Sequence, residues 1–286
     1  TDKGAGSVHS ATTVKLSTSR FRKSSWTYDG TNPVTNGEVA GGVSRRDGHT
    51  AEGNTLTTTS TATTGLNAAY GGKAEAASDV RDNRIVVEGT GSGTIADAVG
   101  GATAKAGGVA EKNHVLIKGG TVTNAMGGFV SGANASATGN ATGNTVTITG
   151  GSMGDAYGGF TSGTGKTTGN TVNLGDGSHA LASGTTINGV LYGGSQTTVT
   201  DNTLNVKTDA TAGNIAHFDK VKFHLNSTIN PANSLLTLNN GAQTTDLNWN
   251  KLEVDTSSLT GAGIKTYEPY KLNLIDNAAG IATTGY

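Results

Sequence analysis

The side chains able to do chemistry in this 286-residue chain rarely stand at the spacing that a catalytic or metal site needs. Residues 165–167 (Gly-Lys-Thr) match the end of a phosphate-binding loop, but Phe160 occupies the place of its first glycine. A glycine-rich stretch around Met153 approaches a calcium-binding repeat, yet Met153 stands where that repeat needs glycine. The six histidines show no metal-ligand spacing, and cysteine is absent. These patterns predict no cofactor, no metal ion, no catalytic residue and no enzyme.

Two markers recur with a shared period and are therefore the main signal in the sequence. The first is an Asn followed by alternating apolar residues, and it begins at Asn54, Asn83, Asn113, Asn144, Asn170 and Asn202. The second is a Gly-Gly pair, which begins at Gly41, Gly71, Gly100, Gly127, Gly158 and Gly193. The Asn spacings are 29, 30, 31, 26 and 32 residues, so the chain contains six units of about 30 residues.

The alternation after each Asn is typical of a strand with one apolar face. A single unit cannot bury that face alone, so the units must stack as successive coils of a rod. The pattern predicts an all-β fold, a parallel β-solenoid of about six glycine-rich coils. We expect the recurrent Asn residues to form a ladder at a turn, and the Gly-Gly pairs to form corners that need positive φ.

Stacking also decides which carboxylates can meet. Asp82 and Asp201 share the column just before the Asn, but they lie four coils apart, about 19 Å, which is too far for a glycosidase pair. Glu88 and Lys118 follow the Asn on adjacent coils and predict an ordinary cross-strand ion pair.

One part of the outward face departs from its threonine-rich composition. Arg84, Val86, His114 and Leu116 should project outward together from two adjacent coils. Either a loop or neighbouring element covers the two apolar residues, or the four residues form a contact patch for self-association or a receptor. A second candidate surface is a carbohydrate-stacking platform of Tyr157 and Tyr192, each of which precedes a Gly-Gly pair.

The markers divide the chain into three parts. Residues 1–38 lack both markers and are expected to cap the first coil or to dock a partner. Residues 39–212 are the regular coils, and residues 213–286 are richer in large apolar residues and are expected to continue the rod as irregular β-structure.

Composition excludes several classes of protein. The net charge of −1 carries no nucleic-acid signature, and no run of eighteen apolar residues could span a membrane as a helix. Glycine supplies 45 residues and proline only three, which excludes collagen.

The units NTVTITGGSMGDAYGGF and NTVNLGDG, with the later segment LTGAGIKTYEPYKLNLIDNAAG, resemble the passenger domains of Gram-negative autotransporters. The resemblance covers residues 39 to about 280 and implies a right-handed β-helix at the cell surface or secreted from it. It also implies a translocator barrel in the precursor, so that this chain is expected to be a cleaved or truncated passenger. It transfers no residue-specific activity.

The expected function is adhesion or cell–cell association outside a bacterial cell, through the faces of the rod. The expected partners are other copies of the chain or a surface receptor, including a glycan. An alternative is a structural subunit that joins end to end into extracellular fibres, because open solenoid ends are unpaired strand edges. A third is a carbohydrate-active enzyme, which would need two carboxylates at catalytic distance in a groove.

Overall fold

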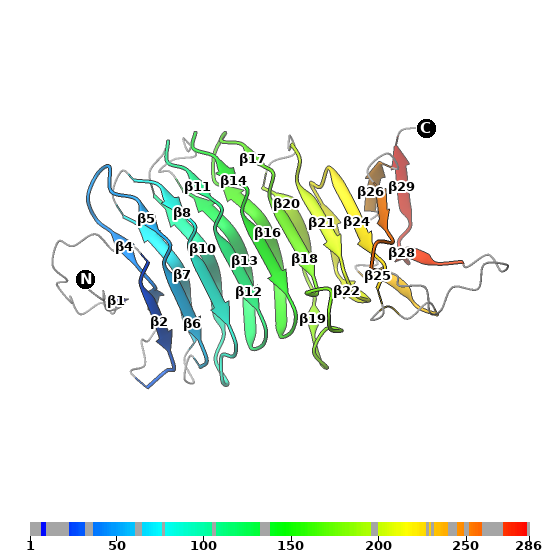
Figure 1. The fold of residues 1–286 in the computed structure, drawn as a ribbon, viewed down its shortest axis with the longest axis horizontal. Coiled ribbons are helices and arrows are strands. Elements are labelled where there is room, and N and C mark those ends of the chain that lie inside the picture. The colour runs from blue at the N-terminus through cyan, green and yellow to red at the C-terminus, as the bar shows by residue number, and fades with distance from the viewer. Residues whose placement is uncertain are drawn as a thin grey trace.

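The computed structural model describes residues 7–9, 23–31, 37–60, 65–75, 78–104, 107–131, 138–195, 200–226, 229, 232–239, 245–248, 252–258 and 271–284. These residues form an all-β rod in which successive coils follow one another along the long axis, as the colour sequence in Figure 1 shows. The predicted parallel β-solenoid of about six turns is therefore confirmed. No helix occurs among the described residues, so none there is long and apolar enough to cross a membrane.

Three sheets run along the rod. Sheet A contains β1 (Ser7–His9), β3 (Glu38–Ala40), β4 (Val43–Ser44), β7 (Leu66–Ala74), β10 (Ile95–Thr103), β13 (Thr121–Val130), β16 (Ser152–Thr161), β19 (Thr186–Ile187), β20 (Val190–Gly194) and β23 (Asn214–Ala216). Sheet B contains β5 (Ala51–Glu52), β8 (Val80–Arg81), β11 (Ala110–Glu111), β14 (Ala141–Thr142) and β17 (Thr167–Thr168). Sheet C contains β2 (Ser25–Tyr28), β6 (Thr55–Thr58), β9 (Arg84–Val87), β12 (His114–Ile117), β15 (Thr145–Ile148), β18 (Thr171–Leu174), β21 (Thr203–Val206), β24 (Lys220–His224) and β27 (Leu252–Asp255).

Two smaller sheets lie at the C-terminal end of the rod (Figure 1). Sheet D contains β22 (Ala210–Ala212), β25 (Ser234–Leu238) and β28 (Asn273–Asn277), and sheet E contains β26 (Thr245–Asn248) and β29 (Ile281–Thr284). The segment LTGAGIKTYEPYKLNLIDNAAG, which resembles the end of a passenger domain, falls partly on residues 259–270, and these lie outside the described residues.

Sheet C buries the predicted apolar columns inside the coil. The first column contains Leu56, Ile85, Val115, Val146, Val172 and Leu204, and each of these side chains is fully buried. Parallel pairing in register stacks each member on the next, as for Val115 between Ile85 and Val146. The narrow interior therefore fills with medium-sized aliphatic side chains, which explains why the chain contains few aromatic residues.

The six recurrent Asn residues form a continuous ladder at the corner between sheets B and C, and each is at most 1% exposed. The Nδ2 of Asn113 donates to Oδ1 of Asn144 at 3.0 Å and to the carbonyl oxygen of Val80 at 3.2 Å. The backbone N–H of Asn113 donates to the same Oδ1 at 2.9 Å. Because the same pattern recurs from Asn54 to Asn202, the backbone groups left free by the bend are satisfied coil by coil.

Side chains of other types end the Asn ladder. At its first rung, the backbone N–H and Oγ of Ser24 donate to Oδ1 of Asn54 at 3.2 and 2.8 Å. At its last rung, the N–H of Asn202 donates to Oδ2 of Asp219 at 3.1 Å. The strands β2 and β24 that follow Ser24 and Asp219 pair in parallel with β6 and β21, so coil geometry extends into both flanking segments.

The expectation that the Gly-Gly pairs form corners is wrong. The pairs lie within sheet A or just beyond β3, and none of their glycines has positive φ. The second glycine of a pair instead lies directly opposite a ladder Asn: a Cβ on Gly72, Gly101 or Gly128 would stand within 2.5 Å of an Asn side-chain atom. The pairs are therefore required because they lack Cβ, which lets sheet A approach the Asn corner.

Positive φ occurs instead at the residue that precedes Ser24 and at the residue that precedes each of the six ladder Asn residues. These residues are Lys23, Gly53, Asp82, Lys112, Gly143, Gly169 and Asp201, with φ between 53° and 66°. The bend from sheet B into sheet C is thus a left-handed residue followed by a buried Asn. Lys and Asp accept this conformation at a cost that Gly avoids.

The N-terminal edge of sheet A has a different pairing from the rest of the rod. β1 pairs with β3 antiparallel, whereas every other strand pair among the described residues is parallel. The edge of β3 that a further parallel coil would use is therefore occupied by a strand of opposite direction.

Candidate functional site

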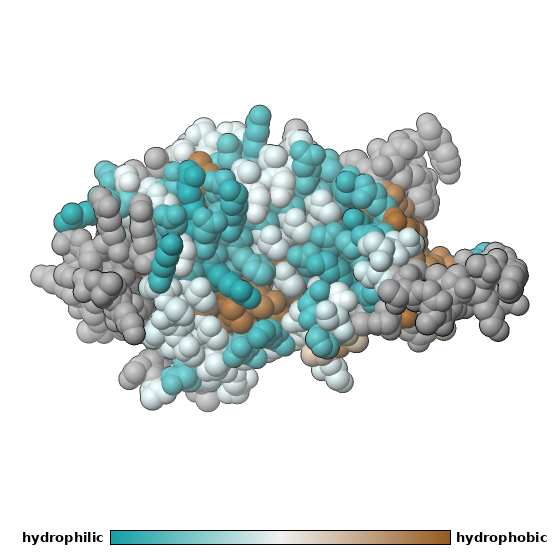
Figure 2. Space-filling model, in the orientation of Figure 1, coloured by the Kyte–Doolittle hydropathy of each residue, from teal (hydrophilic) through white to brown (hydrophobic). Residues whose placement is uncertain are grey.

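The structure brings the four residues of the predicted contact patch together on the outer face of sheet C. Arg84 pairs in register with His114, and Val86 pairs with Leu116. Figure 2 shows a mostly polar surface with a small hydrophobic patch at the place where β12 is labelled in Figure 1, and with further hydrophobic surface near the C-terminal end. Val86 is only 8% exposed and Leu116 is half-buried, so neighbouring side chains on the sheet cover much of the apolar surface.

His114 contributes no positive charge to this patch at neutral pH. Its partial burial, with the nearby Arg84 guanidinium, lowers the pKa of His114 to about 4. Its Nε2 lies 3.1 Å from Oγ1 of Thr147 on the next strand. Directly after β9 and β12, Nζ of Lys118 lies 3.2 Å from Oε1 of Glu88, which confirms the predicted ion pair.

A second row of side chains, here called the outer ladder, begins at His114 and follows the outer face of sheet C. Nδ2 of Asn173 donates to Oγ1 of Thr147 at 3.2 Å, and Nδ2 of Asn205 donates to Oδ1 of Asn173 at 2.9 Å. His224 continues the row with Nε2 at 3.0 Å from Oδ1 of Asn205. The outer ladder contains His114, Thr147, Asn173, Asn205, His224 and Asp255, one from each of six neighbouring strands.

The outer face of sheet A carries an aromatic strip, defined here as Tyr70, Met126, Phe129, Tyr157, Phe160 and Tyr192. All but Tyr192 pack beside the buried Val99 and Ala102 as a cluster separate from the coil interior, and Tyr192 joins them by stacking on Tyr157. Tyr157 and Tyr192 are stacked with ring centroids 4.6 Å apart and planes 3° apart, and Tyr157 meets Phe160 edge-on at 5.2 Å. Met126 is buried at 7% exposure, whereas the five aromatic side chains are half-buried and form an apolar surface that solvent still reaches.

This geometry does not form the flat platform considered for carbohydrate stacking. A sugar stacks on the face of a ring, but the facing sides of Tyr157 and Tyr192 cover each other. His217 lies against Tyr192 with a centroid separation of 5.5 Å. The stack therefore presents ring edges and hydroxyl groups outward.

Acidic and amide side chains flank the aromatic strip along one side. The hydroxyl of Tyr70 donates to Oε1 of Glu38 at 3.2 Å, and Nδ2 of Asn124 donates to Oδ1 of Asp97 at 2.9 Å. Burial, with the nearby Asp155 carboxylate, raises the pKa of Tyr157 to about 12. Its hydroxyl group is therefore neutral at physiological pH.

The sequence did not indicate a cleft of about 550 Å³ beside sheet D. The loop residues Leu181 and Thr185 form one side, and Asp209, Thr211 and Asp276 are among the polar residues of the other. The loop and the strands of sheet D come from distant parts of the sequence that share no repeat. The sequence pattern therefore could not predict that they line one cleft. The lining residues that the structure describes are mostly polar, and none of them is aromatic.

The weaker chemical motifs have structural roles. Asp155, in the glycine-rich stretch around Met153, accepts the N–H of Val190 at 2.8 Å, and the loop residue Asp176 accepts the N–H of Ser178 at 2.7 Å. Thr167 of the phosphate-loop-like segment is fully buried in sheet B. Within the described ranges no three His, Asp or Glu side chains gather as metal ligands. The buried Asn ladder likewise presents no side chain to a ligand.

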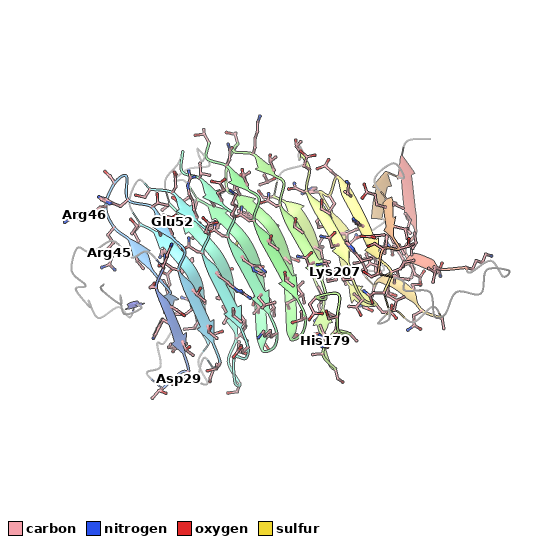
Figure 3. All side chains as sticks on the ribbon, in the orientation of Figure 1. Asp29, Arg45, Arg46, Glu52, His179 and Lys207 are labelled. Carbon is pink, nitrogen blue, oxygen red and sulfur yellow. The ribbon has the colours of Figure 1, made fainter. Side chains whose placement is uncertain are left out.

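Charged side chains also lie at the N-terminal end and on loops of the rod. Figure 3 shows Arg45 and Arg46 at the N-terminal end and His179 on a loop at the lower edge. Nε of Arg45 pairs with Oε2 of Glu75 at 2.9 Å. No family model, no curated protein and no solved structure matches this chain.

Proposed function

We propose that this chain is a surface rod that mediates cell–cell association, with the aromatic strip on sheet A as the contact between copies. The observation that supports this proposal is the composition of the strip. Tyr, Phe and Met are enriched in the cores of protein interfaces, where they supply large contact areas. Such a strip can serve on both sides of one contact, because two copies related by a twofold axis place apolar surface on apolar surface.

The outer face of sheet C is less suited to this role. Its polar side chains already bond to one another along the outer ladder, and Val86 in the predicted patch is 8% exposed. A partner there would have to displace these hydrogen bonds. Contact at the strip on sheet A costs less side-chain conformational entropy, because Tyr157 and Phe160 already pack against each other.

Repetition along the rod strengthens such a contact. The strip passes over successive coils, so two rods that touch at one coil bring the next coils into range. Weak contacts then sum, because each later contact forms within one complex. A cell that displays many rods would multiply this effect.

Bead clumping tests the proposal directly. Beads coated with the purified chain should clump, and the variant Phe129→Thr/Phe160→Thr should reduce clumping at equal coating and unchanged circular dichroism. The matched control is Val86→Thr/Leu116→Thr on the opposite side of the rod, which should clump like wild type. Absence of clumping by the wild-type chain, or loss of clumping only in the sheet C variant, would contradict the proposal.

End-to-end assembly into fibres is the alternative. The antiparallel β1 disfavours it, because β1 occupies the edge of sheet A that an added parallel coil would use. Electron microscopy of concentrated protein separates the two ideas: side-by-side pairs support lateral association, whereas long single-rod fibres support the alternative.

A further inference from the structure

The direction of the hydrogen bonds in the outer ladder determines what His224 must provide. Asn205 uses its Nδ2 to donate to Asn173, so its Oδ1 faces His224 Nε2 at 3.0 Å and needs a donor. The other ring nitrogen, Nδ1, lies 3.2 Å from the carboxylate Oδ2 of Asp255. Both nitrogens face acceptors, so the arrangement fits the doubly protonated imidazolium.

The opposite end of the ladder has the complementary arrangement. Oγ1 of Thr147 accepts the amide proton of Asn173, which leaves its own single proton for His114 Nε2. His114 Nε2 is then an acceptor, and its proton is on Nδ1. The low pKa of His114, about 4, agrees with this neutral ring.

Loss of one proton from His224 removes a donor from the row. The carboxylate of Asp255 retains the proton on Nδ1, because a charged acceptor forms the stronger hydrogen bond. Nε2 then has only a lone pair to face the Oδ1 of Asn205. The amides of Asn205 and Asn173 can restore all contacts by turning over, after which the Thr147 hydroxyl donates to Asn173 and accepts from His114 Nε2–H.

We propose that protonation of His224 sets the direction of every hydrogen bond in the outer ladder, and with it the tautomer of His114 four strands away. Four strand spacings correspond to about 19 Å along the rod. The proton stays near His224 while the bond direction reverses along the row. His114 lies in the predicted contact patch beside Arg84, so this patch would present a different ring nitrogen as donor after the change.

Burial and the charged groups around His224 place the transition below pH 6.5. Lys222 lies on its own strand, Lys207 follows β21, and Asp255 and Glu253 lie on β27; Lys207 is visible on the face of the rod towards its C-terminal end (Figure 3). Glu253 is already paired with Lys220 at 2.7 Å. Burial, followed by the charge of Lys222, lowers the pKa of His224 from its ordinary 6.5, although Asp255 opposes the shift.

The test is the two-bond ¹H–¹⁵N NMR spectrum of the histidine rings, followed from pH 7.5 to 4.5. His114→Gln and His224→Gln variants assign the two rings. We expect His114 to change from the Nε2–H to the Nδ1–H tautomer, without becoming charged, at the same midpoint at which His224 gains its proton. A His114 tautomer that stays constant while His224 titrates would overturn the proposal.

Two variants cut the ladder at different rungs, so that one remains informative if the other misfolds. In Asn173→Ala and in Thr147→Val, His224 should still titrate while His114 no longer follows. Thr171→Val, on the same strand as Asn173 but outside the ladder, should leave the coupling intact. If His114 still follows His224 in both cut variants, the signal does not travel through the ladder and the proposal is wrong.

Discussion

Gly101 and Asn113 lie so close across the coil that a Cβ on Gly101 would stand 2.3 Å from Oδ1 of Asn113. The Gly-Gly pairs and the recurrent Asn residues are thus two halves of one contact. Their shared period follows because each pair of markers meets once per coil. The contact also brings sheet A against the corner between sheets B and C.

This contact predicts that Gly101→Ala destabilises the rod. The added methyl group must displace a buried, hydrogen-bonded Asn, and overpacking of this kind costs about 1–3 kcal/mol. Urea denaturation monitored by circular dichroism measures the change. Gly107→Ala is the matched control, because its Cβ would approach only Thr138 Oγ1, at 3.8 Å. Equal stability of the two variants would show that the close approach is unimportant.

The middle of the Asn ladder should be sensitive to truncation. Asn144→Ala removes the Oδ1 that accepts both the backbone N–H and the Nδ2 of Asn113. Two buried donors lose their partner, and we expect a loss of about 2–5 kcal/mol in the free energy of unfolding. The exposed Asn188→Ala should change it by less than about 0.5 kcal/mol. A similarly small effect at Asn144 would contradict the structural role of the ladder.

The left-handed bend makes two opposite predictions on neighbouring coils. Lys112 has φ of 53°, so Lys112→Gly relieves backbone strain and should stabilise the protein by up to about 1 kcal/mol. Gly143 has φ of 64°, so Gly143→Ala should destabilise it by about 1 kcal/mol. Thermal unfolding of both variants and of the wild type measures the direction of each change in stability. Shifts in the same direction would count against the assignment of the bend.

Thr58 interrupts an otherwise aliphatic core column. Its side chain is fully buried, and its Oγ1 has no hydrogen-bond partner among the described residues. Thr58→Val keeps the shape and removes the unpaired hydroxyl, so we expect a gain of about 1 kcal/mol in the free energy of unfolding. Thr57→Val, on the outward side of the same strand, should have little effect. A loss of stability in Thr58→Val would mean that the hydroxyl group has a partner in solution.

His114 makes the stability of the rod depend on pH. Its pKa in the folded state, about 4, lies below the ordinary value of 6.5, so the unfolded chain takes up the proton first as pH falls. Its contribution is therefore full above pH 6.5 and is lost between pH 6.5 and 4. The loss is at most about 1.4 kcal/mol per pH unit. Urea midpoints of wild type and His114→Gln should converge across this window, and parallel curves would contradict the low pKa.

The architecture was predictable because Asn and Gly-Gly recur in register and each marks a fixed place in the coil. The corner geometry was not, because Asp82 and Lys112 adopt positive φ although their residue types do not demand it. The outer ladder was equally hidden, since its rungs are Thr, Asn and His rather than one residue type. The cleft beside sheet D combines segments without a common period, and only the folded chain brings them together.

The Asn ladder has an electrical consequence for the whole rod. The Nδ2 groups of the first five ladder Asn residues each donate to Oδ1 of the next Asn, so these amide dipoles point the same way and add, as peptide dipoles add along a helix. The negative end lies at Asn54, where Ser24 supplies two donors, and the positive end lies at Asn202, whose backbone N–H donates to the Asp219 carboxylate. The coil stack is therefore a macrodipole whose ends are capped by groups of matching polarity.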